Sequence, residues 1–224
     1  MYRGRMEFRE FGAVNIQRPS LDREDLNKKP AAFKGDFDLE SVHIGQGDQT
    51  RVHGEGNLSH VLVTGVDLSG ARLAPLMLSD VAFDDVDMSN AALPDTTARR
   101  VEFVNCRGIG LQVAVKQATD MYAERCRFDY ATIRIDKVKN AAVFSGCSFR
   151  ETVFVGDLSN VVFADCELYA TEFEVSRAAD CDLRSSRLTD VRGLLTLRGA
   201  KITTEQAVSV ARLIATESGL SVDD

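Results

Sequence analysis

The sequence is poor in several residue types and segments that would mark a membrane protein or a metalloenzyme. It contains no tryptophan, four prolines and three histidines among 224 residues. No apolar run approaches the roughly 18 residues of a membrane-spanning helix, so we expect no membrane segment. The N-terminus lacks the apolar stretch of a secretory signal, and without export the five cysteines would stay in a reducing compartment. We therefore expect a cytoplasmic protein.

Motifs that carry enzymatic chemistry are also missing. The chain has no G-x-G-x-x-G, no P-loop, no G-x-S-x-G and no H-E-x-x-H. His43, His53 and His60 have acidic neighbours, which could suggest a metal site. Their spacings of ten and seven residues argue against convergence on one ion. We expect no metal, no cofactor and no enzymatic activity.

The clearest feature that is present is the spacing of four of the five cysteines. Cys106, Cys126, Cys147 and Cys166 follow one another at intervals of 20, 21 and 19 residues. A period of about 20 residues is typical of proteins in which each repeat forms one turn of a solenoid. With 44% apolar residues, the chain is long enough to bury a sizeable core in one such domain.

A shorter period of five residues runs inside this repeat. Every fifth position from Leu58 to Val138 is apolar apart from Gly108, and we call these positions the centres of the five-residue units. A small or branched side chain usually stands two residues before each centre. The frame then shifts by one residue until it returns at Phe163; the shifted centres are Phe144, Phe149, Phe154 and Ser159. A period of five fits neither the 3.6 residues of a helical turn nor the alternation of a flat strand.

Such a period fits a chain that turns a corner every five residues. One large and one small side chain on each side would point inward, and four sides would close a coil of about 20 residues. We predict that residues 58–202 form such coils, with Phe83, Phe103, Phe144 and Phe163 stacked in one interior column. Lys116 and Asp136 stand at small inward positions and Gly193 at a centre, so the coils there are expected to bulge.

The five-residue units also resemble those of a known family. Val66-Asp67-Leu68-Ser69-Gly70 and Cys181-Asp182-Leu183-Arg184-Ser185 resemble the A(D/N)LXX unit of the pentapeptide repeat proteins, and Cys126-Arg127-Phe128 resembles its C-x-F/L variant. The resemblance covers residues 33–202 in a nearly continuous frame. It implies an all-β solenoid, specifically a right-handed quadrilateral parallel β-helix.

The four evenly spaced cysteines admit three interpretations. Neighbours in one column of the solenoid would lie about 4.8 Å apart. A straight ladder cannot converge on zinc, and parallel side chains are poorly placed for disulfides. We interpret them as reduced, metal-free small hydrophobes that fill the narrow interior position that Val66 and Val86 fill in earlier coils.

The residues after position 202 predict a short α-helix. Thr203 and Gln206 are spaced as in a capping box, and Gly219 predicts the end of the helix, with Leu220 and Val222 folding back. The face of this helix comprises Ala207, Val210, Ala211 and Ile214. Because a solenoid exposes its core at its ends, we expect segment 203–224 to be a cap. A homodimer interface is the alternative, and the two roles are compatible.

Residues 1–32 do not follow the repeat. They mix apolar residues such as Phe8, Phe11 and Ile16 with charged ones and are interrupted by Pro19 and Pro30. We interpret this segment as a strand or loop that covers the first coil, with its earliest residues partly disordered. Partner binding is the alternative function for this segment.

The charge distribution indicates where a partner could bind. The net charge of −7 argues against direct nucleic-acid binding through a basic surface. Acidic residues predominate in residues 58–95 and 151–190, and basic residues predominate in residues 96–150. We predict one outward column that stacks in the order Asp67, Asp87, Arg107, Arg127, Ser148, Glu167 and Arg187.

Two functions fit this pattern. The preferred one is a non-enzymatic scaffold or interaction module with a protein partner. The alternative follows from the family, some of whose members imitate duplex DNA and bind DNA gyrase, protecting it from inhibitors such as quinolones. The candidate acidic surface for that role comprises Asp80, Asp84, Asp85, Asp87, Glu172 and Glu174. Arg107, Arg125, Arg127 and Arg134 interrupt the acidic stretches, which favours the scaffold.

Overall fold

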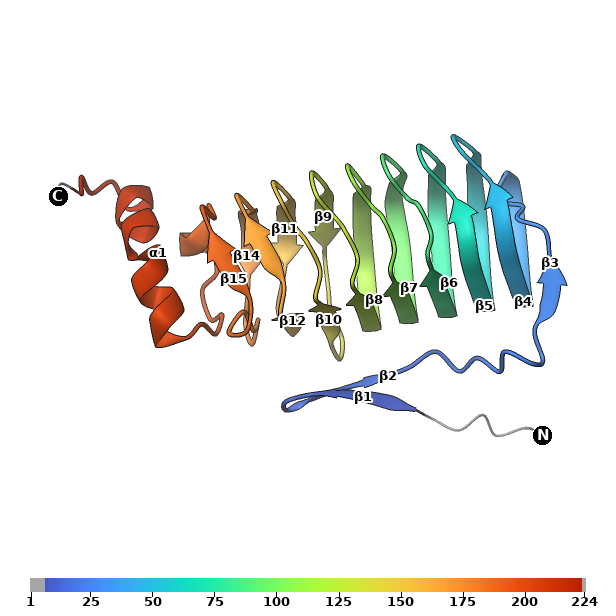
Figure 1. The fold of residues 1–224 in the computed structure, drawn as a ribbon, viewed down its shortest axis with the longest axis horizontal. Helices are drawn as coiled ribbons and strands as arrows, with labels where there is room; N and C mark the ends of the chain where they lie inside the picture. The colour runs from blue at the N-terminus through green and yellow to red at the C-terminus, as the bar shows by residue number, and fades with distance from the viewer. Residues whose placement is uncertain (1–6, 223–224) are drawn as a thin grey trace.

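The fold of residues 7–222 is described by a computed structural model. Within these residues the chain winds into an all-β solenoid of about eight turns with parallel strands, followed by one C-terminal α-helix (Figure 1). This confirms the predicted fold class, a right-handed quadrilateral parallel β-helix with a short C-terminal α-helix. No helix in the described residues is long and apolar enough to cross a membrane.

The N-terminal turns are built from long strands that pass round corners without interruption. Each strand pairs in parallel with the next one along the chain. At one corner the residue takes a positive φ, 56° at Asp80 and 49° at Arg100, which turns the backbone from one wall to the next. The strands are β4 (Gly35–Asp48), β5 (His53–Asp67), β6 (Arg72–Asp84), β7 (Ala92–Val104) and β8 (Gln112–Glu124).

The C-terminal turns follow the same path with shorter strands. The long strand β8 pairs with β9 on one wall and with β10 on the next, so two short strands succeed one long strand. The elements are β9 (Thr132–Ile135), β10 (Ala142–Ser145), β11 (Val153–Asp157), β12 (Val161–Ala164), β13 (Glu167–Tyr169), β14 (Glu172–Arg177), β15 (Arg187–Thr189) and the 3-10 helix η1 (Leu194–Thr196).

Interior side chains stack in columns along the solenoid axis. The rings of Phe83 and Phe103 stack with centroids 5.0 Å apart, and those of Phe144 and Phe163 stack at 5.4 Å. Ala123 is in register between Phe103 and Phe144. The predicted phenylalanine column is confirmed, with Ala123 in its middle turn.

The structure corrects the predicted frame at one position. Phe144 pairs with Ala123 and with Phe163, so one turn has an extra residue and the next turn has one fewer. Leu158 rather than Ser159 is the buried centre in the shorter turn. A register shift between Gly156 and Asp157 absorbs the missing residue, which explains why the five-residue count failed there.

The bulges predicted at Lys116 and Asp136 do occur, both on one wall. Lys116 and Asp136 are exposed, and the preceding residues Val115 and Ile135 are buried in their place. The pairing between β7 and β8 shifts around Thr96, which is the strand partner of Val115 on the next turn. Each outward charge therefore stays in solvent while an aliphatic neighbour fills the interior.

Gly108 is the one centre among those from Leu58 to Val138 that has no side chain, and the structure supplies a reason. A Cβ placed on Gly108 would lie 2.8 Å from Phe128 Cδ1 and 3.3 Å from Leu111 Cδ2. The ring of Phe128 thus occupies the volume that a leucine at this centre would need.

We expect Gly108→Leu to lower the free energy of unfolding by about 1–3 kcal/mol through overpacking, although leucine is common at the other centres. Urea denaturation measures the change. Gly45→Ala is the control, because a Cβ there would lie 3.8 Å from its nearest neighbour, Thr64 Oγ1. A Gly108→Leu chain at least as stable as the wild type would contradict this packing.

The N-terminal segment meets the first coil, as predicted, only through its last strand. β3 (Asn27–Lys29) pairs in parallel with β4 and opens the stack. Before it, β1 (Phe8–Phe11) and β2 (Val14–Gln17) form an antiparallel hairpin that runs back along the side of the solenoid (Figure 1). The hairpin lies against middle turns, where it contacts Tyr122 and Val143, and so does not cover the first coil.

At the other end, α1 (Thr204–Glu217) begins as predicted. Thr203 Oγ1 accepts from the N–H of Gln206, and Gln206 Oε1 accepts from the N–H of Thr203, which confirms the capping box. The Gln206 amide also donates to the carbonyls of Leu183 and Ser186 at 2.7 and 2.6 Å, attaching the helix to the last turn.

The face of α1 that packs on the core differs from the predicted face. Val210 is buried against the core and Ile214 packs beside it, as predicted, together with Leu213. Ala207 and Ala211 are exposed. The helix is therefore rotated so that Leu213, which the prediction omitted, faces the core.

Candidate interaction surfaces

One side of the solenoid carries a column of charged residues, and we call it the charged wall. Its outward residues pair across successive turns in the order Asp67, Asp87, Arg107, Arg127, Ser148, Glu167 and Arg187. The predicted stacking order is confirmed. The sign of charge changes along the column from two acids to two arginines, and then to a neighbouring acid and arginine near the C-terminal end.

Three of the candidate acids lie close together at the corner where β6 ends and the charged wall begins. Asp85 is exposed at the corner, and Asp84 and Asp87 are half-buried beside it. Asp87 Oδ1 accepts from the N–H of Ser89 at 2.8 Å, and its Oδ2 lies 3.9 Å from Arg107 Nε. This acidic group therefore borders directly on the first arginine of the column.

The other two exposed candidate acids lie elsewhere. Glu172 and Glu174 belong to β14, on a different side of the coil from Asp87. Glu172 accepts from Arg192 Nη2 at 3.0 Å, which leaves Glu174 as the more exposed carboxylate. The structure does not bring the two groups of predicted acids onto one face.

Asp80 is not a surface residue, and its inclusion in the acidic surface was wrong. It is 1% exposed, and it accepts from Arg100 Nε at 2.6 Å and from the N–H of Ser20 at 2.9 Å. Burial raises the pKa of the Asp80 carboxyl, but these hydrogen bonds outweigh burial and hold the pKa below its ordinary value. Asp80 is a structural anchor of the N-terminal segment.

Asp80 belongs to a row of polar residues at one corner of the coil, which we call the corner ladder. In chain order the ladder comprises His60, Asp80, Arg100, Asp120, Asn140, Asn160 and Asp180. Asn140 Nδ2 donates to Asp120 Oδ1 at 2.6 Å, and Asp120 Oδ1 also accepts from the N–H of Gln17 at 3.2 Å. The ladder thus binds its own members and the N-terminal segment.

Beside the ladder lies a wall that the N-terminal segment covers. We call residues 7–20 the arm and this side the arm-covered wall. One outward row of this wall includes Ala82, Glu102, Tyr122, Val143 and Val162. Ile16 of the arm is buried against Tyr122 and Val143, with Phe11 and Val14 packed alongside. Apolar outward residues are shielded here by the arm.

Ion pairs fasten the arm to the same wall. Glu102 is buried and accepts from Arg9 Nε at 3.2 Å and from Arg18 Nε at 2.9 Å. The guanidinium of Arg9 also lies 4.4 Å from the ring centroid of Tyr122, within cation–π range. One buried carboxylate therefore holds both strands of the hairpin.

Sequence reasoning missed this wall, although a signal was present. Tyr122, Val143 and Val162 stand between two inward residues of their strands, where a two-residue alternation calls for a polar side chain. Three apolar residues at one outward position on successive turns indicate a covered surface.

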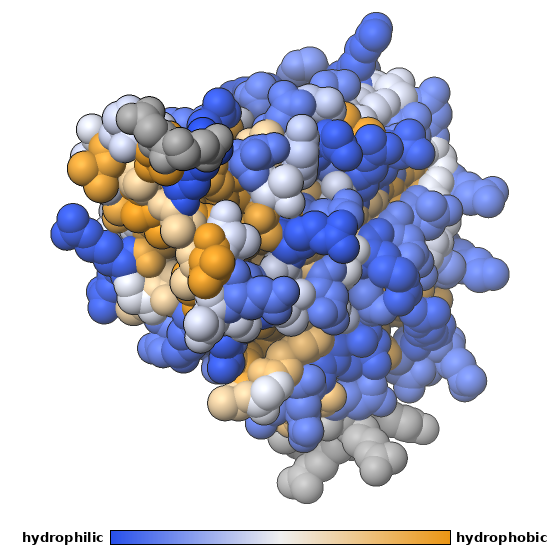
Figure 2. Space-filling model, turned by 60° about the vertical axis from the view of Figure 1, so that its left-hand side comes forward, coloured by the Kyte–Doolittle hydropathy of each residue, from blue (hydrophilic) through white to orange (hydrophobic). Residues whose placement is uncertain are grey.

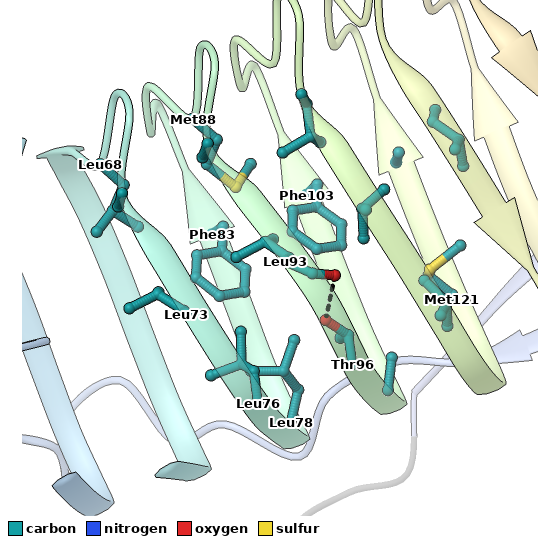
Figure 3. A pocket seen from close by; sticks show the side chains of 18 of the residues that line it. Leu68, Leu73, Leu76, Leu78, Phe83, Met88, Leu93, Thr96, Phe103 and Met121 are labelled. Atoms are coloured by element: carbon teal, nitrogen blue, oxygen red, sulfur yellow. Dashed lines mark hydrogen bonds between the residues drawn. The ribbon is translucent and has the colours of Figure 1, made fainter. Parts of the chain in front are cut away.

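An enclosed space lies inside the coils, and Figure 3 shows side chains that line it. It is an apolar cavity of about 60 Å³, and its lining includes Leu73, Phe83 and Phe103. The hydroxyl of Thr96 donates to the carbonyl of Leu93 and so faces no ligand. With no polar group free to orient a substrate, this cavity is part of the core packing.

All five cysteines are buried, which confirms the burial predicted for Cys106, Cys126, Cys147 and Cys166. Four form the interior ladder, in which the N–H of Cys106 donates to Cys126 Sγ at 3.4 Å and the Cys166 thiol donates to Phe144 O at 3.3 Å. Cys181 lies in another column, and burial raises the pKa of its thiol to about 12. Within residues 7–222, no group of three or more His, Cys, Asp or Glu is placed to hold a metal ion.

We expect Cys126→Ala to change the free energy of unfolding by less than about 1.5 kcal/mol, because the substitution removes only one buried sulfur atom. Thermal or urea denaturation measures the change, and incubation with a chelator or a reductant should leave the midpoint unaltered. Zinc in the purified protein, or unfolding on addition of the chelator, would contradict the assignment.

Comparison with known proteins supports the fold. No protein-family profile and no curated protein matches this chain. Among solved structures, the chain is similar to a trypsin-treated form of QnrB1, a plasmid-mediated fluoroquinolone resistance protein. The TM-score is 0.50 and the identity 19%, over 88% of this chain and 100% of that chain.

A second similarity is weaker. HetL is a pentapeptide repeat protein involved in the regulation of heterocyst differentiation in the cyanobacterium Nostoc. It matches with a TM-score of 0.26 and 15% identity, over 75% of this chain and 86% of that chain. At 19% identity, the similarity to QnrB1 shows a shared fold and nothing further.

Proposed function

We propose that this chain is a non-enzymatic, cytoplasmic scaffold that binds a partner protein through the walls of its solenoid. The alternation of charge along the charged wall supports this function. Asp67 and Asp87 precede two arginines, and Glu167 follows them. Duplex DNA presents one sign of charge throughout, whereas protein interfaces pair patches of both signs. A wall with both signs therefore suits a protein partner.

The immobilised chain should capture its partner from the native cytoplasm, and the charge-reversed variant Arg107→Glu/Arg127→Glu should lose it. Arg192→Glu is the matched control, since Arg192 lies on another side and pairs with Glu172. Equal capture by the two variants would show that the charged wall is not part of the interface. Capture of nucleic acid alone would contradict the proposed function.

The second candidate is a DNA mimic that binds DNA gyrase and protects it from inhibitors. The group formed by Asp84, Asp85 and Asp87 favours it, as does the fold shared with a fluoroquinolone resistance protein. Arg107 and Arg127 interrupt the negative potential of that wall, so we expect weak inhibition of gyrase supercoiling that salt abolishes. Neutralising the three aspartates should remove the inhibition, and Arg107→Gln/Arg127→Gln should strengthen it. Tight, salt-insensitive inhibition would overturn this ranking.

We also propose a homodimer through the C-terminal end. Figure 2 shows apolar side chains gathered at this end. Val208 in α1, which is 74% exposed, and Leu220 just after the helix are exposed large apolar residues. A patch of this kind is often an interaction site. Light scattering should show a dimer that Val208→Asp converts to a monomer, and a wild-type monomer at high concentration would contradict it.

A further inference from the structure

The arm shows how the solenoid can hold an extended polypeptide. Side chains of the corner ladder bond to the arm's backbone: Asp80 to the N–H of Ser20, Asp120 to the N–H of Gln17, and Asn140 Nδ2 to the carbonyl of Asn15 at 2.9 Å. Bonds to backbone atoms are available to any extended chain of suitable course. This part of the contact therefore does not depend on the sequence of the arm.

The selective contacts come from two side chains on each strand of the hairpin. In β1, Arg9 and Phe11 are two residues apart; Ile16 and Arg18 are likewise two apart along and just beyond β2. Residues two apart in an extended chain project to the same side. Each strand thus presents one arginine to Glu102 and one apolar side chain to the wall.

The arm is held less firmly than the interior strands. Ile16 is fully buried, but Phe8 is 55% exposed and Phe11 and Val14 are half-buried. Among the strands described in residues 7–222, β1 and β2 pair with each other alone and not with the solenoid. Segments with few buried apolar contacts open at lower free energy than the core.

The surface that the arm occupies, which we call its seat, continues beyond the tip of the hairpin. A groove of about 740 Å³ extends from Phe11 and Val14 towards Thr203 at the start of α1. Val162 and Ala164 line this groove, and Asn160 and Asp180 continue the corner ladder along it. Apolar outward residues and a polar corner therefore continue beside the arm as far as Val162, after which Asp182 and Lys201 follow in the same outward row.

We propose that the arm-covered wall is a docking site for an extended segment of another protein, in which an arginine stands two residues from an apolar side chain. The arm occupies this site until such a segment enters from the open groove and displaces it. The inference rests on the proposed scaffold function and names the surface and the partner chemistry. Buried Glu102 selects the arginine through charge-assisted hydrogen bonds, and Tyr122 and Val143 select the apolar side chain.

Competition within the chain determines how the site should behave. A tethered arm acts as a ligand at high effective concentration. The apparent affinity for an added segment is then the affinity of the open site multiplied by the fraction of molecules whose site is open. Releasing the arm should therefore strengthen binding. In a chain whose arm is already released, loss of Glu102 should weaken binding, because the arginine of the added segment then has no buried carboxylate to bind.

The test uses a fluorescent peptide with the sequence of residues 7–18 and the full-length chain. Ile16→Asp in the chain places a charge in the apolar seat and should release the arm. We expect this variant to bind the peptide at least tenfold more tightly than the wild type does. Adding Glu102→Gln should weaken that binding at least tenfold, whereas Glu174→Gln, a matched change on another wall, should not. Circular dichroism confirms that each variant is folded.

Arg9→Ala/Arg18→Ala releases the arm by a second route and should bind the same peptide, which guards against misfolding of Ile16→Asp. A folded, arm-released chain that fails to bind, or binding that Glu102→Gln leaves unchanged, would overturn the proposal. A wild-type dimer that the peptide converts to monomers would overturn it too, by assigning the seat to the arm of a second copy. Because only purified chain and peptide are used, failure here leaves capture through the charged wall unaffected.

Discussion

Phe149→Ala is expected to lower the free energy of unfolding by about 3–5 kcal/mol, the range for a fully buried aromatic ring replaced by alanine. Phe149 has no exposed surface, and its ring centroid lies 5.2 Å from that of Phe144 and 5.1 Å from that of Phe154. Phe128 and Phe163 complete the cluster at 5.7 Å each. Rings from three successive turns would border the resulting cavity.

Urea denaturation followed by circular dichroism measures this loss. Cys147→Ala is the matched control, since Cys147 is buried two residues earlier in the same turn and should cost less than about 1.5 kcal/mol. Because each turn contacts only its neighbours, destabilising a middle turn should weaken both halves of the solenoid together. Equal losses for the two variants would show that the aromatic cluster contributes little.

The columns of the solenoid could be predicted from sequence because the five-residue period determines which residues share a wall. Once Asp67 and Asp87 are assigned to one outward column, simple counting places Arg107 and Arg127 after them, as the structure confirms. Counting fails only where the chain gains or loses a residue. The register shift just before Leu158 moves the buried position by one residue. The five-residue period of the sequence does not predict where such a shift occurs.

The arm could not be placed from the sequence, because its position depends on tertiary contacts with no local signature. The period assigns Asp80 to a corner, where exposure is the ordinary expectation, whereas in the structure Arg100 and the arm both lie against it and it is buried. The orientation of α1 escaped prediction for a related reason. Its apolar residues surround much of the helix, so the last turn of the solenoid decides which of them are covered.

The same ambiguity limits what the charges reveal about function. The sequence prediction combined Asp87 and Glu172 into one acidic surface because both lie in acidic stretches of the sequence. In the structure they belong to different walls. Charge is useful for inferring a partner only after the wall is known. The neighbouring arginines, above all Arg107 at 3.9 Å from Asp87, then determine the local potential.

Asp80→Asn should lower the free energy of unfolding by about 3 kcal/mol at neutral pH, the lower end of the range for removing one member of a buried ion pair. The change leaves the Arg100 side chain, 12% exposed, without its counter-charge. It also weakens the acceptor for the N–H of Ser20, so the arm should become more sensitive to proteolysis. Asp87→Asn is the control, because Asp87 is partly exposed and its 3.9 Å pair with Arg107 is screened by solvent.

The pH dependence of this difference follows from the lowered pKa of Asp80 in the folded chain. Burial acts to raise that pKa, but the hydrogen bonds from Arg100 and Ser20 lower it by more than burial raises it. The imidazole of His60 lies 3.8 Å from the same carboxylate. A carboxyl with a lowered folded pKa contributes stability above its unfolded pKa of about 3.9, and the contribution disappears as pH falls through the folded value. Urea denaturation of wild type and Asp80→Asn should therefore show a difference that is present from about pH 8 to pH 5 and shrinks below about pH 4. A difference that persists unchanged at lower pH would mean that the ionised carboxylate is not what holds Arg100 and the arm in place.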